Sequence, residues 1–240
     1  MQEQCSPVWQ TPPVGKRQDA RERTERQIIE VGRAHLATQG AAGLSLRAIA
    51  RELGLVSSAV YRYVASRDDL LTLLLIDAYT DLADAVDEAG EGTDDWRARL
   101  TAQARAARAW AVGDPARWAL LYGSPVPGYH APSERTVGPG TRVVGSLFGT
   151  IAEGIAAGEI SASNGSVPEP TSTDFDGIRA EFSFSGDDAA VMKCLTLWGG
   201  LVGAISLEVF GQYGADTFSD AGLVFDGQVG LLIDLLAATG

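Results

Sequence analysis

The chain has 240 residues, of which 45% are hydrophobic, and its formal net charge at pH 7 is −12. This size and apolar content are typical of one large or two modest globular domains. The two cysteines, Cys5 and Cys194, are too far apart to indicate a disulfide framework, and the most apolar window, residues 194–207, is too short to span a bilayer. We therefore expect a soluble, cytoplasmic protein with no membrane partner.

The acidic total conceals a basic N-terminal part. Residues 16–67 contain ten Lys or Arg against five Asp or Glu, a local charge of +5, whereas the remaining residues carry −17. Phosphates attract the first part and repel the second. The charge distribution therefore favours a nucleic-acid partner for the N-terminal part alone.

Residues 1–19 contain Pro7, Pro12 and Pro13 and show no hydrophobic period, so we predict a disordered arm. The absence of Lys and Arg from the first fifteen residues argues against a secretory leader. Basic side chains follow at Lys16, Arg17, Arg21 and Arg23. They are either phosphate contacts or a solvated lead-in to the first helix, and the sequence leaves both readings open.

The first helix is predicted over residues 20–39, and Gly40 is expected to end it because glycine has no side chain that opposes a left-handed backbone. His35 lies on the apolar face of this helix. A lone histidine among apolar neighbours is more often a packing residue than a metal ligand, and we predict no metal site.

Residues 45–64 form a pattern of two short helices around a tight turn. Ser45 is a predicted N-cap, Gly54 is expected to end the first helix, and Ser57 is expected to cap the second, with Val56 packed on Tyr61. The small Ala50 allows Val60 to approach at a steep crossing angle. This spacing is typical of a helix-turn-helix, whose second helix enters the major groove of DNA. A buried helical hairpin without a DNA role is the alternative.

Polar side chains on this segment favour the DNA reading, and no carboxylate lies between Glu52 and Asp68. Hydroxyl and guanidinium groups reach phosphates and base edges. The predicted DNA-binding residues are Ser45, Arg47, Ser57, Ser58, Tyr61, Arg62, Tyr63 and Arg67. Among these, Ser57, Ser58 and Arg62 are the candidates for base edges, and Arg47, Tyr61, Tyr63 and Arg67 are the candidates for phosphates.

The run from about Arg23 to Leu74 resembles the N-terminal domain of the tetracycline-repressor (TetR) family of transcriptional regulators. The landmarks are the first helix closed by Gly40, Ser45, the pair Ile49-Ala50, Gly54, Tyr61 and the sequence Ser66-Arg67-Asp68 that opens a long helix. Val64 stands where the family usually has an aromatic residue, and Arg67 stands where it usually has Lys. The resemblance implies that the helix over residues 67–88, capped by Ser66 and Asp69, joins a DNA-reading head to a sensory body.

The remaining chain reads as helices separated by turn-rich connections. We predict helices over residues 94–112, 115–123, 141–157, 187–212 and 219–237, and a Pro- and Gly-rich connection over 124–140. Residues 158–186 have little periodicity until Phe182 and Phe184. A connection of this length is either disordered or functional, and we predict a mobile loop, for which a flap over the body is one role.

Small residues on the last two helices indicate close helix approach, either within the chain or at a dimer interface. The predicted dimer-interface residues are Gly199, Gly203, Ser206, Gly227 and Gly230. The stretch 198–211 also resembles a Trp-His-Gly type of C-terminal domain seen in some TetR-like regulators, although Val202 replaces its histidine.

Large aromatic side chains make the C-terminal body suited to an apolar or aromatic effector, although such residues are more often core. The candidates are Trp110, Trp118, Tyr122 and Trp198. No nucleophile with its base, metal-ligand set or phosphate loop occurs in the sequence, so we predict no catalytic residue, no cofactor and no enzyme activity.

Together these features predict an all-α protein. Its parts are a disordered arm (1–19), a three-helix helix-turn-helix domain (20–66), a connecting helix (67–88) and a C-terminal regulatory and dimerisation domain (89–240). The predicted function is a ligand-responsive repressor that binds double-stranded DNA as a homodimer and responds to an unknown small-molecule effector. The alternative is a helical small-molecule-binding or scaffold protein that no longer uses DNA.

Overall fold

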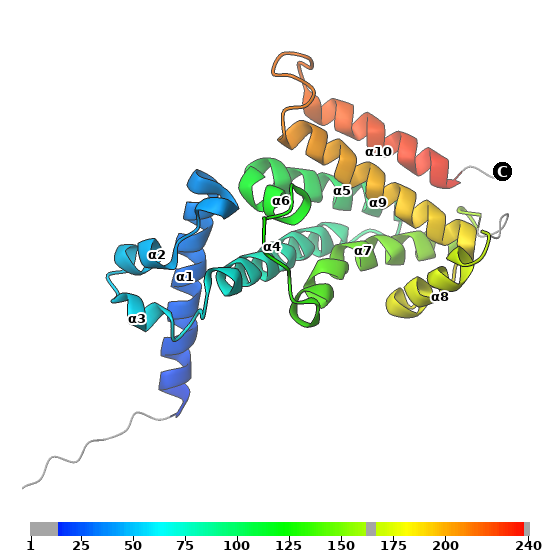
Figure 1. The fold of residues 1–240 in the computed structure, drawn as a ribbon. Coiled ribbons are helices and arrows are strands. Elements are labelled where there is room, and N and C mark those ends of the chain that lie inside the picture. Colours follow the sequence, from blue (N-terminus) through cyan, green and yellow to red (C-terminus); the bar gives the residue numbers. More distant parts are fainter. Residues whose placement is uncertain (1–13, 162–166, 238–240) are drawn as a thin grey trace, which may run out of the picture. The chain divides into compact units, whose positions relative to one another are not determined.

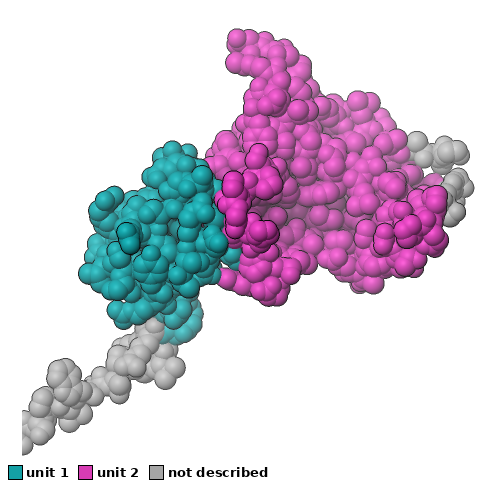
Figure 2. Space-filling view, viewed as in Figure 1, with its two compact units in different colours: residues 1–73 teal, residues 74–240 magenta. Residues whose placement is uncertain are grey.

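The computed structural model describes residues 14–161 and 167–237, and in these residues the chain forms ten helices and no strand (Figure 1). It divides into two compact units, residues 1–73 and 74–240, which Figure 2 colours separately. The all-α prediction is therefore confirmed for the described residues. The boundary between the units falls within helix α4 (Arg67–Gly90).

The first unit consists of α1 (Val14–Gly43), α2 (Leu46–Glu52), α3 (Ser57–Val60) and the start of α4. Helix α1 begins directly after the last proline of the N-terminal region, so the predicted disordered arm is wrong for residues 14–19. Residues 1–13, with Cys5, lie outside the described residues. At Gly40 the backbone leaves the helical region with φ 67°, as predicted, and a further turn follows to Gly43.

The core of the first unit is aliphatic. Ile28, Ile49 and Val60 are fully buried, and Val64 is equally inaccessible, so Val64 is an apolar core residue of this unit. His35 is also buried; its Nε2 lies 2.8 Å from Glu52 Oε2, while its Nδ1 has no hydrogen-bond partner. The predicted packing role of His35 is confirmed, with only one ring nitrogen satisfied.

The start of α4 carries the predicted capping residues. Ser66 Oγ accepts a hydrogen bond from the Asp69 backbone N–H at 3.0 Å, and Asp69 Oδ2 accepts one from the Ala65 backbone N–H at 3.1 Å. These bonds satisfy N–H groups that have no partner inside the helix.

The second unit consists of the rest of α4 and helices α5 (Trp96–Gly113), α6 (Pro115–Tyr122), α7 (Ser133–Ala156), α8 (Thr171–Phe182), α9 (Asp188–Val209) and α10 (Ala221–Ala237). Helix α5 contacts α6, α7, α9 and α10, and α9 pairs with α10 (Figure 1). The largest buried side chains of this unit are Trp118, Phe148 and Phe225.

Helix α7 begins eight residues earlier than predicted and contains Pro139. The predicted connection over residues 124–140 is therefore wrong for its second half. Thr136 is buried, and a Cβ placed on Gly140 meets the Tyr79 ring at 3.4 Å, so this part of α7 packs closely on α4. Such tertiary packing overrides the low helix propensity of Gly138-Pro139-Gly140.

Helix α8 occupies much of the predicted mobile loop over residues 158–186, so that prediction is wrong for residues 171–182. Phe175 of α8 is buried, and the Phe148 ring lies 4.8 Å from Phe182 and 5.0 Å from Phe184 between centroids. These long-range aromatic contacts hold the segment on the core. Residues 162–166 lie outside the described residues.

Helix α9 is long and apolar enough to cross a membrane by length and composition alone. In this structure it is instead a core helix, because Val191, Leu197 and Ile205 are buried against its neighbours. Cys194 is a buried free thiol in the same helix.

Candidate DNA interface and effector cavity

The turn between α2 and α3 is built by local hydrogen bonds. Ser45 Oγ caps α2 by accepting from the Ala48 N–H at 3.4 Å. At the other end Gly54 has φ 66°; its N–H donates to Arg51 O, and the Leu55 N–H donates to Ala50 O at 2.8 Å. These two bonds form a Schellman motif, in which a left-handed glycine satisfies the last carbonyls of a helix. The predicted roles of Ser45 and Gly54 in the turn are confirmed.

Helix α3 starts differently from the prediction. Val56 occupies the N-cap position, so Ser57 is the first helical residue and not the cap. Val56 is 69% exposed and Tyr61 is 46% exposed, so the predicted packing of Val56 on Tyr61 is wrong. After Val60 the chain continues as a turn through Tyr63. Since Ser57 does not cap the helix and is exposed, its hydroxyl is accessible from solvent.

The eight predicted DNA-binding residues fall into two groups. Five have exposed side chains on α2, on α3 and in the turn that follows it: Arg47, Ser57, Ser58, Tyr61 and Arg62. The other three are partly buried. Ser45 caps α2, the Tyr63 ring lies 5.7 Å from the Arg21 guanidinium carbon, and Arg67 Nη2 donates to the main-chain oxygen of Ala41 at 2.7 Å. These three side chains already hold the head together.

Arg51 was missed by sequence reasoning. It is exposed one helical turn after Arg47 on α2. Residues four apart lie on one face of a helix, so the two guanidinium groups present positive charge together. In a helix-turn-helix the first helix crosses the phosphate backbone, which makes Arg51 a further phosphate-contact candidate. Its i, i+4 spacing from Arg47 was the available signal.

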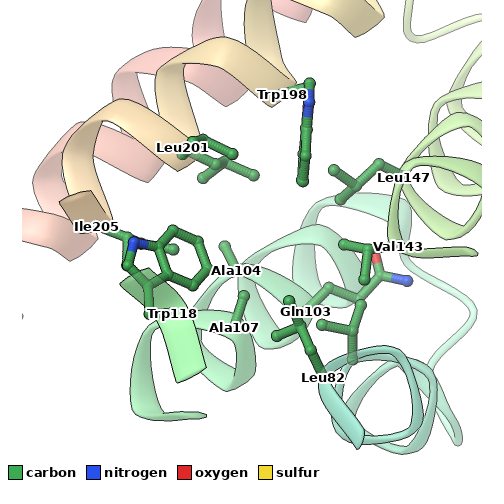
Figure 3. Close-up of a pocket in the computed structure, with 12 residues that line it drawn as sticks. Leu82, Gln103, Ala104, Ala107, Trp118, Val143, Leu147, Trp198, Leu201 and Ile205 are labelled. Carbon is green, nitrogen blue, oxygen red and sulfur yellow. The ribbon is translucent and has the colours of Figure 1, made fainter. Parts of the chain in front are cut away.

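The second unit contains an apolar cavity in its core (Figure 3). Its walls come from α4, α5, α6, α7 and α9. The lining residues are Leu82, Val86, Gln103, Ala104, Ala107, Trp118, Val143, Leu147, Trp198, Leu201, Val202 and Ile205. The cavity volume is about 20 Å³, which is room for about one water molecule.

Two of the four aromatic effector candidates line this cavity. The Trp118 and Trp198 indoles approach it from α6 and α9 (Figure 3), and Trp118 Nε1 donates to Ser206 Oγ at 3.1 Å. Trp110 does not line it, because its Nε1 donates to Asp81 Oδ2 and its ring lies under the Arg117 guanidinium. Helical spacing alone did not distinguish the two aromatic residues that line the cavity from the two that do not.

Tyr122 also lies outside the cavity wall. Its ring centroid is 4.3 Å from that of Trp118 and 5.6 Å from that of Trp198, so the Tyr122 ring packs against both indoles. Its hydroxyl is buried without a hydrogen-bond partner. Burial, followed by the neighbouring Tyr79, raises the pKa of the Tyr122 hydroxyl well above its ordinary value. Tyr122 is therefore a neutral packing residue at physiological pH.

The predicted interface glycines face open space. A Cβ added at Gly199, Gly203, Gly227 or Gly230 meets nothing within 4 Å. The close approach of α9 and α10 within the chain occurs instead at Gly200, where a Cβ would lie 3.0 Å from Leu232, a contact that sequence reasoning missed. Ser206 accepts a hydrogen bond from Trp118, so its hydroxyl serves the packing of the chain itself. Within the described residues no cluster of His, Cys, Asp and Glu is arranged to hold a metal ion.

Comparison with known families matches both units. Residues 28–74 match the description "Bacterial regulatory proteins, tetR family", and residues 100–232 match "Tetracyclin repressor-like, C-terminal domain".

Curated relatives and solved structures agree with these matches. The HTH-type transcriptional regulator Rv1816 of Mycobacterium tuberculosis is 64% identical over 232 residues, which cover 96% of this chain and 99% of that protein. The regulator Mb1846 of Mycobacterium bovis gives the same values. The crystal structure of the regulatory protein SCO4313 is 31% identical with a TM-score of 0.75, and covers 93% of this chain and 100% of that one.

Proposed function

Since the chain belongs to the TetR family of helix-turn-helix transcriptional regulators, which are not enzymes, we propose that it is a ligand-responsive repressor. In this proposal it binds a near-palindromic DNA operator as a homodimer in the cytoplasm. The observation that carries the proposal is a set of exposed side chains with no carboxylate between Glu52 and Asp68: Arg47 and Arg51 on α2, Ser57 and Ser58 on α3, and Arg62 in the turn after it.

DNA contact by this face follows from its chemistry. The guanidinium groups of Arg47 and Arg51 suit phosphates, and Arg62, Ser57 and Ser58 suit base edges in the major groove. Ser45, Tyr63 and Arg67 have a different role in this proposal, because their side chains are held within the head. Their contribution to affinity comes mainly from positioning α2 and α3.

Dimerisation through α9 and α10 is supported by their apolar open faces. Leu223, Leu231 and Leu235 of α10 are 69%, 71% and 53% exposed, and the open positions at Gly203 and Gly227 allow another helix to approach. Exposed apolar side chains of this number mark an association surface. A two-fold axis would present two recognition helices to successive major grooves roughly 34 to 36 Å apart.

Effector response is supported by the continuity of α4. Its first turn carries Arg67 in the first unit, and its later residues Leu82 and Val86 line the apolar cavity. An effector that widens the cavity must displace these side chains, and a displacement of α4 changes the spacing of the two heads. We expect coupling of about 1 to 3 kcal/mol between effector and operator.

A salt titration of DNA binding tests the DNA face. In plots of log K against log salt, Arg47→Ala is expected to reduce the magnitude of the slope by about 2, because each of the two copies in the dimer loses one phosphate contact. Arg62→Ala is expected to change base preference by about 1 to 3 kcal/mol at one position. Arg105→Ala is the matched control, since it removes the same charge from an exposed pair with Asp226 in the second unit.

Three outcomes are distinguishable in this titration. A slope that changes with Arg47→Ala and stays constant with Arg105→Ala supports the DNA face. Identical slopes for both variants, or a wild type whose affinity is insensitive to salt, contradict it. If the substitutions lower only the melting temperature, the protein is a scaffold that keeps the head for packing.

A further inference from the structure

Val56 is an exposed apolar residue at the start of α3. Its side chain is 69% exposed, and within residues 18–73 of the first unit Tyr61 is the one other large apolar side chain that is exposed. All the remaining large aliphatic and aromatic side chains of this range are partly or fully buried. Single exposed apolar residues are common on protein surfaces. Exposure alone therefore does not give Val56 a role, but its position on α3 does.

Valine is poorly suited to the position that Val56 occupies. It is the N-cap of α3 and makes no side-chain hydrogen bond to the helix. Ser, Thr, Asp and Asn are strongly preferred at an N-cap because their oxygen atoms accept from the first N–H groups, whereas Val is among the least favoured residues. Burial does not compensate for the missing cap, since the side chain is exposed. A local rule that is broken without a gain in folding is typical of functional positions.

The backbone on both sides of Val56 is fixed by hydrogen bonds. The Leu55 N–H donates to Ala50 O at 2.8 Å, and the oxygen of Val56 accepts from the Ala59 N–H at 2.8 Å. A side chain that branches at Cβ also has few χ1 rotamers, so it loses little freedom when it makes a contact. The isopropyl group of Val56 is therefore held ready for an apolar contact outside the chain.

The major groove offers one apolar partner on the base edges, the C5-methyl group of thymine. In a helix-turn-helix the N-terminal residues of the second helix contact base edges, and Val56 directly precedes the first helical residue of α3. We propose that Val56 is a specificity-determining residue that contacts the C5-methyl group of one thymine in each half-site of the operator. This assignment rests on the DNA recognition proposed above.

Replacement of thymine by deoxyuridine tests this contact, because it removes the methyl group and leaves base pairing intact. The operator that the full-length protein selects from random duplexes is synthesised again with each thymine replaced in turn, symmetrically in both half-sites. Fluorescence anisotropy titration gives the dissociation constants. We expect one thymine position in each half-site at which replacement weakens wild-type binding about fourfold, or about 15-fold for both half-sites together, as the exposure of one methyl group requires.

Variants of Val56 assign the methyl contact to this side chain. Val56→Ala is expected to bind the thymine and deoxyuridine operators equally. Val56→Ser is expected to do the same and to unfold at a higher urea concentration, because serine caps α3, so lost discrimination does not reflect lost folding. Val112→Ala is the matched control, since it truncates an exposed valine of α5 in the second unit and should keep wild-type discrimination. Tyr61→Ala should weaken binding to both operators alike.

The outcomes separate the methyl contact from DNA binding itself. Deoxyuridine sensitivity that disappears in Val56→Ala and Val56→Ser but persists in Val112→Ala supports the contact. A selected half-site without thymine, equal binding of both operators by the wild type, sensitivity that persists in Val56→Ala, or sensitivity that disappears only in Tyr61→Ala overturns it. With any of these results a symmetric operator still supports the proposed DNA function. Selection of no operator overturns the proposed function and the methyl contact together.

Discussion

The guanidinium of Arg67 donates a hydrogen bond to the main-chain oxygen of Ala41 at 2.7 Å. This bond fastens the first turn of α4 to the end of α1, directly before Ser45 and α2. Arg67 therefore sets the position of the helix-turn-helix from within the head. The sequence predicted that Arg67 contacts a phosphate. In the structure its guanidinium is bonded to the main chain of α1, and its side chain is only 35% exposed.

Replacement of Arg67 by Ala is expected to lower the free energy of unfolding by about 1.5 to 3 kcal/mol, because a hydrogen bond to a charged group is lost. DNA affinity is expected to fall for all sequences alike, since the head loses its alignment. Urea denaturation and DNA titration measure the two effects. Arg62→Ala is the control: its side chain is exposed, so stability should remain within about 0.5 kcal/mol. Unchanged stability of Arg67→Ala contradicts the positioning role.

Gly54→Ala tests the turn between α2 and α3. A Cβ at Gly54 meets nothing within 4 Å, so the expected cost arises from the backbone at φ +66° alone. Left-handed conformation costs a non-glycine residue about 1 to 2 kcal/mol. Denaturant unfolding is expected to report a loss of that size. Gly113→Ala, which also meets nothing within 4 Å but lacks a positive φ, is expected to be neutral or stabilising. Equal effects of the two substitutions would refute this explanation.

Gly203→Leu tests the α9–α10 surface as a dimer interface. The position is open within one chain, so the added side chain should disturb only a second copy. We expect sedimentation equilibrium to show dimer dissociation increased at least tenfold. Gly177→Leu on the exposed surface of α8 is the control and should leave association unchanged. A dimer of wild-type strength in Gly203→Leu places the interface elsewhere.

Asp188 makes the packing of α8 sensitive to pH. Arg179 and then Ser172 hold the pKa of the Asp188 carboxyl below its ordinary value, and Asp188 also accepts from the Val167 N–H. A lowered pKa in the folded state contributes stability that is present above the ordinary pKa of about 4 and is lost as pH falls through the folded value. The hydrogen-exchange protection factors of the α8 amides, relative to their intrinsic rates at each pH, are therefore expected to fall below about pH 4. Asp188→Asn should show the faster exchange already at pH 7, and an unaltered pH profile in this variant would exclude Asp188 as the cause.

The head was predictable because its signals are local. Ser45 and Gly54 act through bonds to residues within four positions, so spacing alone indicates the turn. The start of α3 was not predictable from the same signals. Ser57 is the type of residue that caps helices, which favoured it as the N-cap. In the structure Val56, one residue earlier, is the N-cap, and no side chain accepts a capping hydrogen bond there.

The C-terminal unit was less predictable because its order depends on distant contacts. Helix α8 is held by contacts with Phe148 of α7 and Asp188 of α9, and neither residue belongs to α8 itself. The sequence of residues 158–186 alone therefore resembled a loop. The aromatic candidates were indistinguishable in sequence for the same reason. Only the fold shows that Trp118 and Trp198 reach the cavity while Trp110 turns toward Asp81.

DNA recognition by a homodimer is tested by selection of DNA from a random duplex pool with the purified full-length protein. We expect a two-fold symmetric site whose half-sites lie about one helical turn apart or a multiple of it, bound by two copies of the chain. We also expect Arg62→Ala to alter the bases selected within each half-site. Recovery of no enriched sequence, or of an asymmetric site bound by a single copy, would refute DNA recognition by a homodimer.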